Sequence, residues 1–124
     1  MSLQQNLGQA MQKIPDYTDA ELWTVRSTLE ERYGKAIEIE LADCEIRLHP
    51  ADRTLTECPA LFWSQRDANF IVVKVAKSEY RSQFYYRGYQ QYGTGQQSYD
   101  NIGDCVITLL QVQSDHERSQ AEDK

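Results

Sequence analysis

The pattern of apolar and polar residues predicts a helix over residues 19–33. Thr18 and Glu21 have the spacing of a capping box, in which each side chain accepts a hydrogen bond from the other residue's backbone amide. Apolar residues then recur every three or four positions along one side of the segment, as in an amphipathic helix. Gly34 follows where a left-handed residue commonly ends a helix. This helix is the clearest local signal in the chain.

Residues 1–17 are predicted to form an N-terminal arm. The apolar residues of its first part lie at near-helical spacing, at Leu3, Leu7, Met11 and Ile14. Gly8 and several glutamines weaken the helical pattern, so we expect a helix there only where the arm docks on a surface. Pro15 disfavours helical geometry in the residue before it and would end this helix.

Beyond residue 35 apolar and polar residues alternate, which is typical of β-strands with one solvated face. We predict strands over residues 37–41 and 44–48, joined by a tight turn at Ala42-Asp43. The next segment, residues 50–58, is polar and is expected to be a loop.

A second pair of strands is predicted over residues 60–65 and 70–76, joined by a polar turn at residues 66–69. Residues 70–76 read FIVVKVA and are almost all apolar, as expected of a strand covered on both faces. We therefore expect this strand in the middle of the sheet.

Two later segments each allow a strand or a helix. The aromatic residues of segment 79–87 favour a strand, which we prefer, whereas Ser78 and Gly88 would suit the ends of a short helix. In segment 104–116 the spacing of apolar residues favours a helix, which we prefer, although three consecutive β-branched residues would suit a strand. Between them, the glycine-rich residues 88–103 indicate a loop.

Together these elements predict a single α+β domain over residues 18–116, followed by a polar tail over residues 117–124. We expect an antiparallel sheet of four to five strands, packed on one face against the helix at 19–33 and a C-terminal helix. The chain length of 124 residues fits one domain of this kind. The pattern does not decide which face of the sheet stays open.

The overall charge bears on the class of protein. A net charge of −6 argues against a nucleic-acid-binding protein, whose affinity would come largely from neutralising phosphates. No stretch of the sequence has the length and apolar character of a membrane span, and the first ten residues do not resemble a signal peptide. We therefore expect a cytoplasmic protein.

Side chains capable of chemistry form no catalytic or metal-binding motif. The sequence contains three cysteines, Cys44, Cys58 and Cys105. A zinc site from Cys44, His49 and Cys58 has none of the usual spacings, so we expect the thiols to be reduced packing residues and expect no metal or cofactor. Glu38 and Glu40 could form an acid–base pair, but they occupy the outward positions of an amphipathic strand. These observations favour a protein without enzymatic activity.

Residues 80–99 differ in composition from the rest of the chain. This segment holds six of the eight tyrosines, two arginines and five glutamines, and it contains no acidic residue. Enrichment in tyrosine and arginine is typical of recognition surfaces, although burial of half of the tyrosines would account for the pattern equally well. The candidate partner-binding residues, with Trp63 as a wall of the site, are Trp63, Arg81, Tyr85, Tyr86, Arg87, Tyr89 and Tyr92.

This composition leaves three hypotheses for function. The first is a non-catalytic adaptor that binds a peptide segment of a protein partner, with the arginines orienting the peptide and the tyrosines supplying contact area. The second is a small-ligand-binding protein or enzyme with a Tyr/Arg pocket under the loop at residues 88–103. The third is single-stranded nucleic-acid binding, because residues 84–89 interleave aromatic and basic side chains. The oligomeric state stays open.

Three short motifs carry a resemblance to a known family: Tyr86-Arg87-Gly88-Tyr89, Tyr92-Gly93-Thr94-Gly95 and Gly103-Asp104-Cys105-Val106. With them the chain resembles small cyanobacterial proteins, and among these most the assembly factors of the β-carboxysome, over roughly residues 17–115. The resemblance implies a cytosolic, non-enzymatic adaptor that binds the C-terminal extension of a shell protein. It assigns no role to any single residue.

Overall fold

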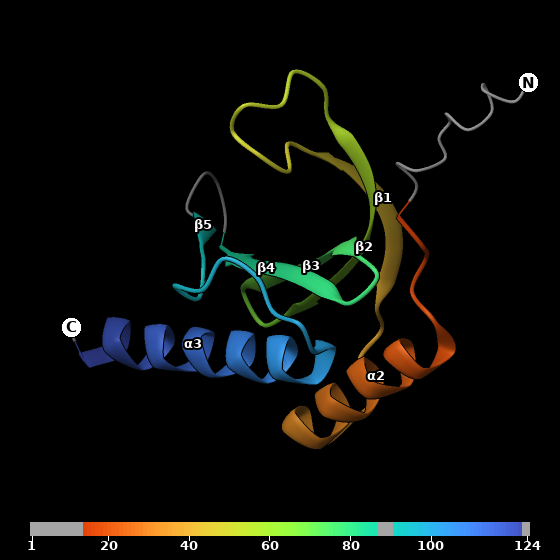
Figure 1. Cartoon of the computed structure of the whole chain (residues 1–124). Coiled ribbons are helices and arrows are strands. Elements are labelled where there is room, and N and C mark those ends of the chain that lie inside the picture. The colour runs from red at the N-terminus through yellow and green to blue at the C-terminus, as the bar shows by residue number, and fades with distance from the viewer. Residues whose placement is uncertain (1–13, 87–90, 123–124) are drawn as a thin grey trace, which may run out of the picture.

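A computed structural model describes residues 14–86 and 91–122 of the chain. Its elements in chain order are α2 (Asp19–Tyr33), β1 (Glu40–Ile46), β2 (Thr56–Gln65), β3 (Ala68–Ala76), β4 (Glu79–Tyr85), β5 (Gln91–Tyr92) and α3 (Ile102–Glu122). The two helices lie on the same side of a five-stranded sheet (Figure 1). The structure confirms the predicted single α+β domain. The helical pattern predicted in the N-terminal arm, from Leu3 to Ile14, lies outside the described residues, apart from Ile14.

The sheet is antiparallel, and its strands are neighbours in chain order from β1 to β5. The apolar strand β3 is therefore in the middle, as predicted. The prediction of a strand after residue 78 is also confirmed, because β4 pairs with β3 along its whole length. Two consecutive short connections, at residues 66–67 and 77–78, join β2, β3 and β4, and the β3–β4 pairing shifts its register between Lys74 and Ala76.

The predicted turn at Ala42-Asp43 is wrong. Both residues lie inside the continuous strand β1, where they pair with residues of β2. A turn there would interrupt the continuous backbone pairing that β1 forms with β2 from Glu40 to Ile46. The chain turns instead in the loop at residues 47–55, and β2 starts at Thr56, within the segment predicted to be a loop.

The ends of α2 match the sequence signals closely. The Thr18 hydroxyl accepts a hydrogen bond from the Glu21 amide at 3.1 Å, and the Glu21 carboxylate accepts one from the Thr18 amide at 2.7 Å. At the other end, Gly34 has a φ of 75°, and its amide donates to the Glu30 carbonyl at 2.8 Å. The capping box and the glycine C-cap are both confirmed.

The second helix begins after an irregular segment that is fixed to the sheet. Tyr99 forms a two-way backbone bridge with Tyr80, with both N–O distances 2.8 Å. Asn101 then caps α3, its side-chain oxygen accepting from the Asp104 amide at 2.9 Å. The preferred reading of segment 104–116 as a helix is confirmed. The helix continues to Glu122, through most of the segment predicted to be a polar tail.

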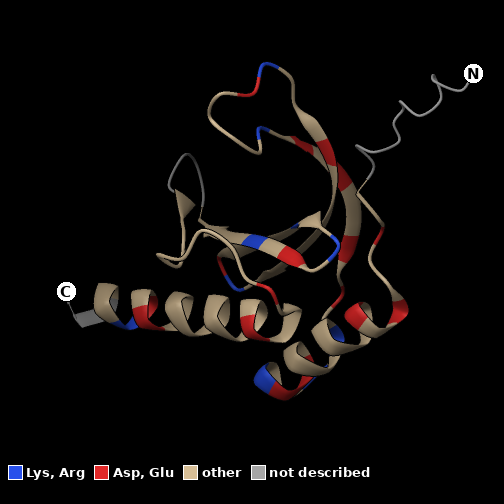
Figure 2. Cartoon of the chain, in the orientation of Figure 1, with Lys and Arg blue, Asp and Glu red and all other residues tan. Residues whose placement is uncertain are grey.

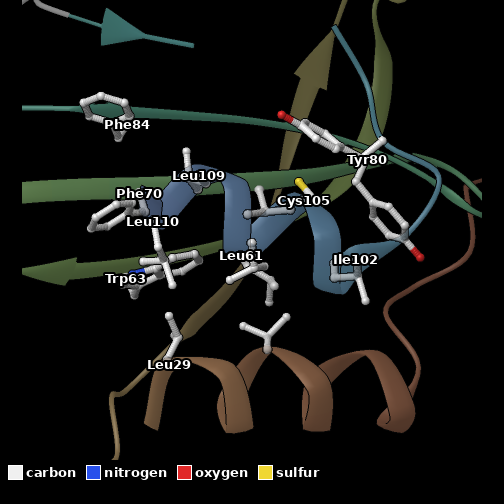
Figure 3. Packing of buried hydrophobic residues seen from close by; sticks show 14 of the residues in the cluster. Leu29, Leu61, Trp63, Phe70, Tyr80, Phe84, Ile102, Cys105, Leu109 and Leu110 are labelled. Carbon is white, nitrogen blue, oxygen red and sulfur yellow. The ribbon is translucent and has the colours of Figure 1, made fainter. Parts of the chain in front are cut away.

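The main hydrophobic core fills the space between the sheet and the two helices (Figure 3). Val25 and Leu29 of α2, together with Leu109 of α3, are fully buried against the sheet. The strands contribute alternate residues to the same cluster, including Leu61, Trp63, Phe70, Val72 and Phe84. The other set of alternate residues therefore faces away from the helices.

A charged pair lies at the edge of this core. The Lys74 ammonium, whose residue is 1% exposed, donates to the Glu21 carboxylate and to the Asp16 carbonyl, both at 2.9 Å. The Tyr80 hydroxyl donates to the second oxygen of Glu21. Burial alone would raise the pKa of Glu21, but the hydrogen bonds from Tyr80 and Lys74 lower it below its ordinary value. This network ties the start of α2 to β3 and β4.

Candidate functional site

The face of the sheet that is turned away from the helices carries a second, smaller apolar cluster. Its buried members come from β2 and β3: Cys58, Ala60, Val73 and Val75. Ile46 and Leu48 pack against them, because the end of β1 and the loop after it curve over this face (Figure 1). Within residues 14–86 and 91–122, no helix contributes to this cluster. The open face left undecided by the sequence is therefore this one.

A groove of about 480 Å³ lies on this open face. It is bounded on one side by the end of β1 and on the other by the glycine-rich loop after β5. Its lining residues are Ile46, Ile71, Val73, Arg81, Ser82, Gln83, Gly93, Thr94, Gly95, Gln96 and Gln97. The residues from β1 and β3 form an apolar floor, and those from β4 and the loop add polar groups.

Arg81 is the charged residue of the groove. It lies opposite Val73 in the β3–β4 pairing, and its Nη2 atom donates to the Leu48 carbonyl at 3.0 Å. This contact ties β4 to the loop after β1. The Arg81 Nε atom is buried and has no hydrogen-bond partner among the described residues. Leaving such an N–H group unpaired is costly, and because the atom is buried, a ligand oxygen would reach it only after the Arg81 side chain moves.

The charge around Arg81 differs from that of the rest of the molecule. The groove lining contains no carboxylate, although the chain carries 19 acidic residues. Acidic side chains lie instead along β1 and on both helices (Figure 2). The groove is therefore suited to an electron-rich group beside an apolar one.

The predicted site residues separate into several environments. Arg81 lines the groove, and half-buried Tyr85 lies on the same strand, two positions beyond the groove residue Gln83. Trp63 is 3% exposed in the main core, where its ring stacks on Phe70 at a centroid distance of 5.0 Å. Trp63 therefore has no surface to offer a partner and is not part of the site we describe.

Tyr86 and Tyr92 belong to an aromatic cluster on the helix-covered side. Tyr92 stacks on Phe84 at 5.2 Å, and its ring centroid lies 4.3 Å from that of His116 on α3. The Tyr86 hydroxyl accepts a hydrogen bond from the Gln113 amide at 3.1 Å and lies 3.3 Å from His116 Nδ1. Both tyrosines are half-buried and join β4 and β5 to α3. The structure therefore brings them together, but away from the groove.

The other tyrosines and the second arginine of residues 80–99 lie either in the core or outside the described residues. Tyr80 and Tyr99 are buried in the core, at 4% and 6% exposure. The predicted residues Arg87 and Tyr89 lie outside the described residues, so their part in binding stays a prediction. The segment at residues 80–99 thus provides core, aromatic cluster and one wall of the groove.

Sequence reasoning missed the floor of the groove. Ile71 and Val73 alternate along β3 with the core residues Phe70 and Val72, so the run FIVVKVA does indicate a strand with two apolar faces. The sequence places the helix at 19–33 and the C-terminal helix on one face, and it assigns no element of the domain at residues 18–116 to the second apolar face of this strand, on which Ile14 of the N-terminal arm packs. That mismatch was the available signal for a binding surface.

Other kinds of site find no support in the described part of the chain. It contains no group of three or more His, Cys, Asp or Glu side chains placed to hold a metal ion. Glu38 and Glu40 are both exposed, as expected for the outward positions of this segment. Neither described helix has the length and apolar character needed to span a membrane.

The chain was also compared with known proteins. No protein-family model matches it, and neither a search of curated proteins nor a search of solved structures found a similar protein.

Proposed function

We propose that this protein is a non-catalytic binding or assembly-adaptor protein that holds a peptide segment of a protein partner in the groove on the open sheet face. The observation that carries the proposal is a groove lining that combines the Arg81 guanidinium with an apolar floor and contains no carboxylate. An extended peptide supplies both an apolar side chain and acceptor oxygens. The resemblance to β-carboxysome assembly factors makes the C-terminal tail of a shell protein a specific candidate.

The groove suggests how such a peptide is held. An apolar side chain packs on Ile46, Ile71 and Val73, which removes their exposed surface from water. The Arg81 guanidinium donates to a peptide carbonyl or carboxylate, and a hydrogen bond to a charged group is worth about 1.5–3 kcal/mol. The glutamines and Thr94 at the rim pair with backbone amides and carbonyls.

Selection of peptides from a random display library tests this proposal. A selected peptide carrying a fluorescent label is titrated with wild-type protein and with Arg81→Gln. We expect Arg81→Gln to weaken binding about tenfold, which corresponds to the loss of one charged hydrogen bond. Arg26→Gln on α2 makes the same charge change at an exposed position on the other side of the sheet and should leave the affinity unchanged.

A second variant guards against a folding defect in Arg81→Gln. Gln83→Glu places a carboxylate at the exposed rim without removing any described hydrogen bond, and it should weaken binding of a peptide carboxylate. Gln111→Glu, exposed on α3, is its control. Failure to enrich any peptide, or equal affinity of all four variants and the wild type, would overturn the proposal.

The groove volume also lies in the range of small-molecule pockets, which supports the alternative that the protein binds a small ligand or is an enzyme. A thermal-shift screen with metabolites distinguishes small-ligand binding from peptide binding, because a ligand at a hundred times its dissociation constant adds about 2.7 kcal/mol to the free energy of unfolding. A metabolite that stabilises the protein and displaces the selected peptide would assign the groove to a small ligand.

A further inference from the structure

Cys44 and Cys58 lie directly opposite each other on neighbouring strands. They are partners in the antiparallel pairing of β1 with β2, and both belong to the apolar cluster of the open face. Both thiols are free. Their side chains therefore leave the sheet on the same side and from adjacent positions.

This placement meets the distance requirement for a disulfide. Residues directly opposite each other in an antiparallel pair have Cα atoms about 4.5–5.5 Å apart, and disulfide-bonded cysteines have Cα atoms about 4.4–6.8 Å apart. The third cysteine, Cys105, lies in the other cluster, on the helix-covered side of the sheet. Among the three thiols, only Cys44 and Cys58 share a cluster.

We propose that Cys44 and Cys58 form a redox-active pair, which a low-molecular-weight disulfide such as glutathione disulfide converts to an intrachain disulfide. This inference concerns a modification site and does not depend on the proposed peptide binding. The bond joins the edge strand β1 to β2, its neighbour in the sheet. It lies two residues from Ile46, so it also fixes the β1 wall of the groove.

The reaction proceeds through two exchange steps. Cys44, the more exposed thiol, loses its proton and attacks one sulfur of glutathione disulfide, and one glutathione thiolate leaves. Cys58 then loses its proton and attacks the Cys44 sulfur, and the second glutathione leaves. The protein loses two protons and two electrons, and the oxidant becomes two molecules of glutathione.

The surroundings of the two thiols make the exchange slow at neutral pH. Burial raises the pKa of Cys58 to about 11, with a smaller contribution from Cys44, and burial also raises the pKa of Cys44. The Cys58 thiol also lies 3.5 Å from the Thr56 carbonyl and has to leave that contact before it reacts. Because the thiolate is the attacking species, the rate should rise with pH.

Oxidation of the folded, full-length chain with glutathione disulfide tests the inference. After the protein is unfolded in urea with N-ethylmaleimide present to block the remaining thiol, intact-mass measurement should show a species with one blocked thiol and a loss of about 2 Da for the bond. Peptide mapping should find Cys44 linked to Cys58 and Cys105 alkylated. Formation of this species should be about 50-fold or more faster at pH 9 than at pH 7, because the thiolate fraction of a thiol with a pKa above 9 rises by that factor.

Variants and a denatured control complete the experiment. Cys105→Ser should form the bond as the wild type does, whereas Cys44→Ser should not form it. In concentrated urea all three pairings should appear, which shows that the fold selects one of them. A stable glutathione adduct on Cys44 without the intrachain bond, or a bond involving Cys105 in the folded protein, would overturn the inference.

Discussion

Glu21 is the residue through which α2 is joined electrostatically to the sheet. Its carboxylate pairs with Lys74, and the two side chains are 12% and 2% exposed. Replacement of Glu21 by Gln leaves the Lys74 ammonium buried without a counter-ion, a type of change that costs about 3 kcal/mol or more. We expect Glu21→Gln to lower the free energy of unfolding in urea by about that amount. Glu30→Gln, exposed on the same helix, should change it by less than about 0.5 kcal/mol.

Glu21 also makes the free energy of unfolding depend on pH, and the direction follows from the shift of its pKa. The pKa of Glu21 in the folded protein lies below its ordinary value of 4.5. The contribution of the Glu21 carboxylate to the free energy of unfolding is therefore complete above pH 4.5 and is lost as the pH falls through the lower pKa of the folded protein. The difference in unfolding free energy between wild type and Glu21→Gln should narrow on acidification below pH 4.5. A difference that stays constant down to pH 2 would show that the carboxylate charge plays no part.

Individual residues also show where prediction from sequence stops. The capping role of Glu21 follows from local spacing and was predicted. Its pairing with Lys74 joins residues 53 positions apart and depends on the way the helix lies on the sheet. In the sequence, Lys74 stands out only as the one charged residue of an apolar strand, and this pattern does not indicate which carboxylate it pairs with.

At the scale of elements, Gly34 ends α2 in a conformation that other residues rarely adopt. Its φ of 75° lies in the left-handed region, where a side chain with a Cβ atom is strained. We expect Gly34→Ala to lower the free energy of unfolding by about 1 kcal/mol, measured by urea denaturation. The matched control is Gly93→Ala, because Gly93 is not among the positive-φ glycines and no atom lies within 4 Å of an added Cβ. Equal effects of the two substitutions would contradict this explanation.

Turns explain why one element boundary was wrong and others were right. The turn between β2 and β3 is formed by Arg66-Asp67, and Arg66 adopts a φ of 56°. Neither this pair nor Ala42-Asp43 contains glycine or asparagine, so residue type does not distinguish the true turn from the false one. Ala42-Asp43 does not turn because β1 pairs with β2 along its whole length, and the local sequence pattern carries no information about that pairing.

At the scale of the whole molecule, the fold was largely predictable and the groove was not. Helical caps, alternation and the apolar strand β3 are local signals, and they were sufficient for the fold class and for the central place of β3 in the sheet. The groove combines Ile46, Ile71, Arg81 and the loop at residues 93–97, which meet only through the sheet register and the curve of β1. The tyrosine-rich segment contributes one wall of the groove, but much of its aromatic surface stabilises the fold.

The net charge of the whole molecule leads to a test of the hypothesis that the protein binds single-stranded nucleic acid. The chain has a net charge of −6, and the groove contributes one arginine, whereas binding to single strands requires a cationic path for several phosphates. We expect a fluorescently labelled oligothymidylate of about 20 nucleotides to show a dissociation constant weaker than about 100 µM at physiological salt. The measurement is fluorescence anisotropy, with an established single-strand-binding protein as the positive control. Micromolar binding that weakens steeply as salt is added would mean that several cations contact phosphates, and the open face would then have to be reassigned to nucleic acid.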